Sequence, residues 1–237
     1  MERRGNTVGQ ADVTEMFDAI APVYDRLNTV MTLRSDGRWR RRAARAAGLA
    51  PGERAVDVAC GTGKLSVELA HLVGPFGNVE GVDLSAAMLE RAAREHRALV
   101  QLHFQVGDAL ALPFDDDTFD AATIAFGLRN LPDFAAGFRE MARVVRPGGR
   151  VVCLELSRPP AGLWARAYQG LFRWLAPTAA RLLGGRVAAY GYLPASLEGF
   201  PTAESLAETM RSGGLAQVRF WRLSTGIAVI HRGIVPG

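Results

Sequence analysis

Hydrophobic residues recur along this chain in two alternating patterns, which predict strands followed by helices. From residue 52 onward, short apolar runs alternate with amphipathic stretches of helical period. This alternation is typical of α/β proteins with a parallel sheet. The predicted strands cover residues 54–60, 79–83, 101–107, 119–125 and 150–156. The predicted helices between them cover residues 62–73, a stretch that Ser85 caps, and a stretch that Asp133 caps and residues 146–149 stop.

The C-terminal part predicts one more helix, at 202–212, and two strands at 215–222 and 226–234. Because so few residues separate these strands, we expect them to pair as an antiparallel hairpin. The predicted fold is a Rossmann-like, doubly wound α/β sheet, mostly parallel, with an antiparallel C-terminal hairpin strand.

Two segments depart from the alternation. Residues 13–27 show helical spacing of apolar positions, broken near Pro22, after a polar start that we expect to be disordered. Residues 159–190 combine Trp, Leu and Arg, as amphipathic helices do when they cover a core, form a subunit contact or lie at a membrane surface. We therefore predict an N-terminal helical cap at 1–50 and a main domain at 51–237, with an amphipathic insertion at about 159–200.

A second N-terminal helix is predicted at 36–47, where five arginines surround Trp39. It is either a solvated helix with one aromatic anchor or a basic face directed at acidic lipid or substrate. All but one of the 28 basic residues are arginine, yet the net charge is only +4, so the balance of charge does not require nucleic acid.

Cysteine and histidine positions argue against disulfides and metal sites. Cys60 and Cys153 fall in apolar runs and are expected to be small buried residues in a reducing compartment. The four histidines form no ligand-spaced cluster, so no metal is expected. The chain lacks both a signal-like start and a run of eighteen apolar residues, which predicts a cytoplasmic protein.

The stretch 56–64 carries the strongest chemical signal. An apolar strand containing Asp57 ends in Gly61-Thr62-Gly63 and runs directly into a helix, so that backbone N–H groups face a crevice. A dinucleotide-binding loop would have a third glycine at the position of Ser66, and Asp57 is a poor neighbour for a pyrophosphate. S-adenosylmethionine carries an ammonium and a sulfonium and no phosphate, so it fits this loop better.

Two more carboxylates are predicted at the same edge of the sheet. Asp83 ends the second strand, where it can accept hydrogen bonds from ribose hydroxyls, and Asp108 ends the third, where it can accept one from the adenine amino group. A dehydrogenase that binds NAD would explain Asp83 but neither Asp57 nor Asp108. Beyond the fourth strand, Arg129 and Asn130 could hold an oxygen anion on the acceptor or simply bond to the loop backbone.

These motifs resemble class I S-adenosylmethionine-dependent methyltransferases, and more closely the family that methylates quinone rings in menaquinone and ubiquinone biosynthesis. The resemblance covers about residues 13–235. Its motifs are MFDAIAPVYDRLN at 16–28, WRR at 39–41, FGLRN at 126–130, YLPAS at 192–196 and TGIA at 225–228, followed by His231.

The resemblance implies C-methylation of a demethylmenaquinol to menaquinol, with cofactor contacts at Thr62, Asp83, Asp108 and Ala109. To these the loop itself adds Asp57, Gly61 and Gly63, so that 51–237 becomes an S-adenosylmethionine-binding methyltransferase domain. Arg129 and Asn130 are the first choice for activating the acceptor, and Tyr24 and His231 are alternatives.

The resemblance also implies a polyprenyl quinol substrate and favours peripheral contact with the inner face of the cell membrane, with a homodimer as a further possibility. Methylation of a ubiquinone-pathway benzoquinol, of another small molecule or of RNA stays an alternative, as do an NAD-linked reductase and a non-catalytic lipid-binding protein.

Overall fold

The computed structural model describes residues 34–157 and 199–237, together with residues 15, 18, 25, 29 and 32. The predicted amphipathic insertion at 159–200, the motif at 192–196 and the start of the chain therefore lie outside the described residues, apart from 199 and 200. Tyr24 lies outside them as well.

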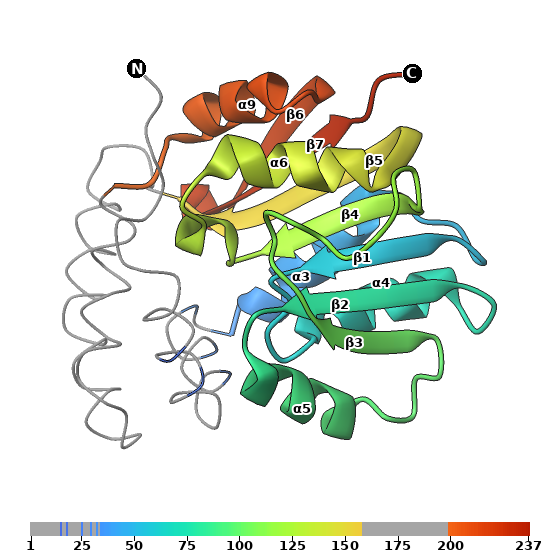
Figure 1. The fold of residues 1–237 in the computed structure, drawn as a ribbon. Coiled ribbons are helices and arrows are strands. Elements are labelled where there is room, and N and C mark those ends of the chain that lie inside the picture. Colours follow the sequence, from blue (N-terminus) through green and yellow to red (C-terminus); the bar gives the residue numbers. More distant parts are fainter. Residues whose placement is uncertain are drawn as a thin grey trace.

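A seven-stranded sheet in the order β3-β2-β1-β4-β5-β7-β6 forms the centre of the molecule (Figure 1). The strands β1 to β5 pair in parallel, and β7 is antiparallel to both β5 and β6. In chain order the strands are β1 (Arg54–Val58), β2 (Asn78–Asp83), β3 (Leu102–Val106), β4 (Phe119–Ala125), β5 (Val145–Leu156), β6 (Ala216–Leu223) and β7 (Ala228–Ile234). The predicted fold class, including the C-terminal hairpin, is confirmed.

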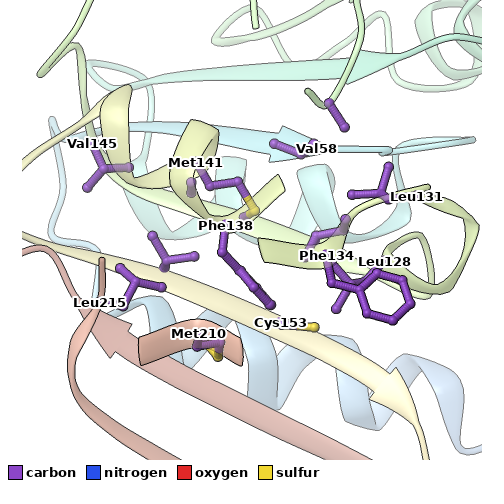
Figure 2. Close-up of a cluster of buried hydrophobic side chains, with 14 of the residues drawn as sticks. Val58, Leu128, Leu131, Phe134, Phe138, Met141, Val145, Cys153, Met210 and Leu215 are labelled. Atoms are coloured by element: carbon purple, nitrogen blue, oxygen red, sulfur yellow. The ribbon is translucent and has the colours of Figure 1, made fainter. Parts of the chain in front are cut away.

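Helices cover both faces of the sheet, as parallel sheets require. They are α3 (Asp36–Ala47), α4 (Lys64–Val73), α5 (Ala86–Glu95), α6 (Phe134–Arg143) and α9 (Ala203–Ser212). The helices α6 and α9 share a hydrophobic cluster on one face, which includes Phe138, Met141 and Met210 (Figure 2). On the opposite face α3 and α4 pack together with strand residues. The division of the chain at residue 50 stays a prediction.

Helix caps fall where the sequence predicts them. The side chain of Ser85 accepts a hydrogen bond from the backbone N–H of Met88, and Asp133 accepts one from Ala136. Strand one is shorter than predicted because Ala59 takes a positive φ of 51°, which ends the extended backbone after Val58. The helix that follows this strand, α4, correspondingly begins at Lys64 rather than at residue 62.

One prediction near the middle of the chain is wrong. Residues 146–149 do not stop a helix, because α6 already ends at Arg143 and β5 begins at Val145. The Pro-Gly-Gly run is absorbed into the strand, where the pairing with β4 has a register shift and Gly148 takes a φ of 80°. A bulge of this kind accommodates Pro and Gly, which occur more often in turns than within strands.

Candidate functional site

A glycine turn joins β1 to α4 at the carboxyl edge of the sheet. Gly61 and Gly63 both have positive φ angles, 56° and 76°, which glycine adopts without steric cost. A Cβ atom on Gly63 would lie 2.7 Å from Cζ of Phe104, whereas one on Gly61 would meet nothing within 4 Å. Gly63 therefore lets the loop pack on the sheet, and Gly61 leaves the adjoining backbone open to a ligand.

The carboxylate of Asp57 lies beneath this loop and is only 1% exposed. Its two oxygens accept hydrogen bonds of 2.7 Å from the hydroxyls of Ser66 on α4 and Thr123 on β4. Burial raises the pKa of Asp57 to about 6, although both hydroxyls oppose that rise. Ser66, which stands at the position of a dinucleotide loop's third glycine, thus ties α4 to β1. Contact between Asp57 and a cofactor ammonium stays a prediction.

Asp83 connects the ends of β1 and β2. Its carboxylate accepts hydrogen bonds from the backbone N–H groups of Gly61, at 2.8 Å, and Ser85, at 2.9 Å. Burial raises its pKa, and these backbone donors act against the rise. The residue is half-buried, and each of its carboxylate oxygens can accept a further hydrogen bond. This geometry is compatible with the predicted contact to ribose hydroxyls.

Asp108 follows β3, the next strand across the sheet. One of its carboxylate oxygens accepts a hydrogen bond of 2.9 Å from the backbone of Leu110. The side chain of Ala109 is 6% exposed and belongs to the core cluster, so a cofactor contact there would involve backbone atoms. Asp57, Asp83 and Asp108 thus stand at or near the carboxyl ends of three adjacent strands, β1, β2 and β3. Such a set of acceptors fits the donor groups of S-adenosylmethionine.

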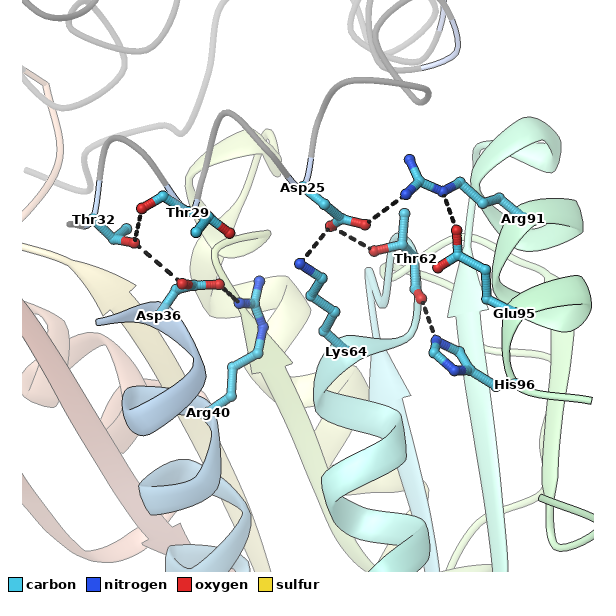
Figure 3. A network of polar contacts seen from close by, with 10 residues as sticks. All are labelled: Asp25, Thr29, Thr32, Asp36, Arg40, Thr62, Lys64, Arg91, Glu95 and His96. Atoms are coloured by element: carbon cyan, nitrogen blue, oxygen red, sulfur yellow. Dashed lines mark hydrogen bonds and ion pairs between the residues drawn. The ribbon is translucent and has the colours of Figure 1, made fainter. Parts of the chain in front are cut away.

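An aspartate from the N-terminal segment closes over the glycine turn (Figure 3). Asp25 is 8% exposed and accepts a hydrogen bond of 2.9 Å from the hydroxyl of Thr62. It also forms ion pairs with Lys64, at 3.3 Å, and Arg91, at 3.1 Å. Sequence reasoning singled out the surrounding motif but not this carboxylate. The hydroxyl of Thr62, a predicted cofactor contact, is directed at Asp25 in this structure.

A second loop, after β4, lies against the first. Phe126 has a φ of 61°, and Ala59 in the glycine turn has a φ of 51°; such angles are uncommon outside glycine and cluster at functional sites. A Cβ atom on Gly127 would lie 2.6 Å from Cβ of Ala59. The loop that carries Arg129 can therefore approach the glycine turn only because residue 127 has no side chain.

Arg129 stands in the short 3₁₀ helix η1 (Leu128–Asn130) and forms a buried ion pair with Glu155 on β5. Arg129 is 7% exposed and Glu155 1%. Burial raises the pKa of Glu155, and the neighbouring guanidinium of Arg129 opposes this rise. The ion pair fixes the guanidinium between the loop and the sheet. Glu155 was not predicted, because a carboxylate inside an apolar strand gives no local sign of its partner.

Arg40 on α3 departs from the predicted solvated or lipid-directed face. It is 7% exposed and forms an ion pair of 3.1 Å with Asp36 (Figure 3). Its guanidinium also lies 4.9 Å from the ring centroid of Phe126. Its positive charge also opposes the rise that burial causes in the pKa of Asp57. The spacing of Asp36 and Arg40, one helical turn apart, is the signal that could have identified this pair.

His231, the alternative base, is 1% exposed and contacts the carbonyl oxygen of Ala203 through Nε2 at 2.8 Å. Burial lowers its pKa to about 4. Its other ring nitrogen has no hydrogen-bond partner in the described part of the chain. Because the side chain packs between β7 and α9 beside Phe220, the described surroundings are those of a neutral core histidine.

The structure also bears on metals, cysteines and membranes. Within the described ranges, no three His, Cys, Asp or Glu side chains are grouped so that they could hold a metal ion. Cys60 and Cys153 are free thiols, and burial raises the pKa of both. Among the helices that the structure describes, none has the length and apolar content to span a bilayer.

Comparison with known proteins agrees with this geometry. The model of the ubiE/COQ5 methyltransferase family matches residues 5–235. A demethylmenaquinone methyltransferase from Desulfitobacterium hafniense is 39% identical over 231 residues, which cover 95% of this chain and 90% of that relative. A protein of the same name from Clavibacter sepedonicus is 40% identical over 224 residues, covering 94% and 90%.

Solved structures share the fold at low identity. The [4+2]-cyclase SpnF has a TM-score of 0.72 at 20% identity, with 99% of both chains covered. An S-adenosylmethionine-dependent methyltransferase from Aquifex aeolicus has a TM-score of 0.62 at 16% identity, covering 83% of this chain and 89% of that one.

The fold, the glycine turn and the family match together define an S-adenosylmethionine-dependent methyltransferase. Within that class, the chain belongs to the ubiE/COQ5 methyltransferase family.

Proposed function

We propose that this protein transfers a methyl group from S-adenosylmethionine to a ring carbon of a demethylmenaquinol, giving a menaquinol. The observation that carries this proposal is the similarity, at 36–40% identity over nearly the whole chain, to relatives named demethylmenaquinone methyltransferase. The arrangement of acceptors and of the Arg129 loop supports it independently.

The first half of the site would hold the cofactor. Asp83 would accept hydrogen bonds from the ribose hydroxyls, and Asp108 would accept one from the adenine amino group. Asp57, held by Ser66 and Thr123, would contribute negative charge beneath the glycine turn. When bound, the cofactor supplies an electrophilic methyl group on a sulfonium. Because the transfer is a single displacement, alignment and exclusion of water are the main contributions of the protein.

The second half would activate the acceptor. A phenolic hydroxyl has a pKa of roughly 10, as in tyrosine, so the quinol must lose or share its proton before its ring carbon becomes a strong nucleophile. Arg129 and Asn130 would hold the resulting oxygen anion, working through a water. The pair with Glu155 occupies part of the Arg129 guanidinium, which has five N–H donors in all, and leaves others for the acceptor.

The hydrophobic tail of the substrate also affects where the enzyme works. We propose a cytoplasmic enzyme that contacts the inner face of the cell membrane peripherally, because a polyprenyl quinol partitions into the bilayer. A homodimer is a further proposal, which sedimentation of the purified protein would test.

Methyl transfer should be measured with the purified chain, labelled S-adenosylmethionine and three acceptors in parallel: a demethylmenaquinol, a demethylated benzoquinol and bulk RNA. The proposal expects label in the ring of the naphthoquinol at the highest kcat/KM. Calorimetry with S-adenosylmethionine and NADH forms the companion measurement. Preferential NADH binding, or label only in RNA, would contradict the proposed function.

A further inference from the structure

A groove with a basic rim lies between α3 and the strands β6 and β7. It has a volume of about 460 Å³. Four arginines line it, two from the helix and two from the strands: Arg42, Arg45, Arg222 and Arg232. Leu223 and Ile230 contribute apolar side chains from the sheet. The groove therefore combines positive charge with an apolar surface.

Much of this charge is not neutralised within the described part of the chain. The side chains of Arg42 and Arg45 form no hydrogen bond or ion pair with any described residue, and both residues are exposed on α3. Arg222 is paired with Glu204. In Arg232, the Nε atom is buried and has no hydrogen-bond partner among the described residues. The described residues therefore neutralise the positive charge of the groove only in part.

Trp221 gives the groove its second property. Its side chain is 44% exposed, and the guanidinium of Arg232 lies 6.0 Å from its ring centroid. An exposed tryptophan beside arginines is typical of surfaces that meet the boundary between water and lipid. Guanidinium groups in turn match phosphate oxygens through paired N–H donors. The ligand that fits both features is an amphiphile with a phosphate head.

The groove is linked to the acceptor side of the candidate site through α3. On the same helix Arg40 contacts the ring of Phe126, next to the Arg129 loop. Trp39 donates a hydrogen bond of 3.1 Å to the hydroxyl of Ser224, between β6 and β7. A second hollow, of about 370 Å³, continues the basic surface along the helix past Arg38 and Arg41. A surface bound by α3 would thus lie close to the acceptor loop.

We propose that this groove, formed by α3, β6 and β7, binds the phosphate head groups of anionic lipids and so orients the enzyme on a membrane. The inference rests on the proposed function, because a quinol with a polyprenyl tail is reached from the bilayer. It assigns the attachment to the described arginines and Trp221. Nucleic acid, which also offers phosphates, fits less well, because the groove presents one aromatic ring rather than a track of them.

Vesicle flotation tests the assignment directly. The full chain is mixed with vesicles of phosphatidylcholine alone or with added phosphatidylglycerol. We expect binding to the anionic vesicles only, and release when salt shortens the screening length. The double variant R42Q/R45Q should bind anionic vesicles about 30-fold more weakly, at about 1 kcal/mol for each arginine near the surface. The variant W221A should also bind more weakly.

The matched control is R94Q/R97Q, which removes the same charge from exposed arginines at and beyond the end of α5. It should bind anionic vesicles as the unmodified chain does. Equal losses in both double variants would show attraction by net charge alone and would overturn the groove assignment. Equal binding to neutral vesicles, or an RNA that binds the same arginines more tightly than the vesicles do, would overturn it as well.

Methyl transfer in detergent separates this inference from the proposed function. With demethylmenaquinol in micelles, R42Q/R45Q should retain the kcat of the unmodified chain, because these arginines lie outside the candidate catalytic loop. In vesicles, the same variant should lose rate at low enzyme concentration. If no methyl transfer occurs while vesicles still bind through the groove, the proposed function fails and the lipid site stands. Inorganic phosphate as a competitor tells whether the head group alone is recognised.

Discussion

Arg129 and Glu155 form an ion pair that is almost completely buried between η1 and β5. The pair joins the loop of the proposed acceptor site to a central strand, so Glu155 orients a guanidinium that would otherwise be able to rotate. A buried charge that loses its partner is destabilising by about 3–5 kcal/mol, whereas removal of both charges is often tolerated.

The variants R129A and E155Q should therefore both reduce kcat far more than they reduce the affinity for S-adenosylmethionine. The double variant R129Q/E155Q separates catalysis from folding, because it should recover stability without recovering turnover. Denaturant titration gives the stability, and calorimetry gives the cofactor affinity. Glu53→Gln, a carboxylate paired with Arg150 away from the loop, serves as the control. Unchanged turnover in R129A would remove this residue from the site.

Close contact between the two site loops leads to a second prediction. G127A should lower both stability and activity, because its Cβ would lie 2.6 Å from Cβ of Ala59. The double variant A59G/G127A removes the clash and relieves the positive φ of residue 59, so it should recover most of the loss. A59G alone should be neutral or slightly stabilising. Failure of the double variant to recover would show that the loops do not pack as described.

The buried carboxyl of Asp57 should give stability a pH dependence of unusual sign. Its pKa is about 6 in the folded protein against 3.8 for an ordinary Asp, so the folded state holds the proton more tightly than the unfolded chain does. This contribution to stability is present below about pH 3.8 and is lost as pH rises to 6. The shift in pKa corresponds to a contribution of about 3 kcal/mol to the free energy of unfolding at low pH.

The measurement is the difference in the free energy of unfolding between the unmodified chain and D57N. That difference should fall by about 2 kcal/mol from pH 4 to pH 7, which is most of the whole effect, since the carboxyls common to both proteins cancel. S66A should extend the fall to higher pH, because it removes a hydrogen bond that stabilises the charged form. A difference that is flat across this range would contradict the assignment.

His231 should show the opposite slope. Its pKa is about 4 in the folded protein against an ordinary 6.5, so the unfolded chain binds the proton more tightly. Stability from the neutral ring is present above pH 6.5 and is lost as pH falls toward 4, by about 3 kcal/mol. The difference between the unmodified chain and H231Q should rise with pH over that interval. If His231 were the catalytic base, H231Q would instead lose the dependence of kcat on pH that this residue causes.

Local patterns predicted the elements well and their partners poorly. The period of apolar residues placed the strands to within a few residues, and the caps at Ser85 and Asp133 followed from side-chain chemistry alone. The same patterns could not show that Asp57 is held by Thr123 on another strand, or that Arg129 meets Glu155, because those contacts join distant parts of the chain.

Arg40 illustrates the same limit within one helix. Its neighbours Arg41 and Arg42 are exposed, yet Arg40 is buried against Asp36 and Phe126. An arginine-rich run indicates a charged surface, but the orientation of one member depends on what the rest of the fold places beside it. The Pro-Gly-Gly run at 147–149 failed as a helix stop for a related reason, since it lies in β5 at the register shift against β4.

The strand order puts β1 between β2 and β4. Strands β2 and β3 are added on one side of β1, and β4 and β5 on the other, so the topological switch point of the sheet lies at β1. The proposed cofactor contacts stand on or just after β1, β2 and β3, whereas the proposed acceptor contacts follow β4 and are held by Glu155 on β5. The two sets of contacts therefore come from different strands. Redesign of the loop after β4 and the end of β5 would change which molecule receives the methyl group while the three aspartates remain untouched, which makes that half the natural target for engineering new specificity.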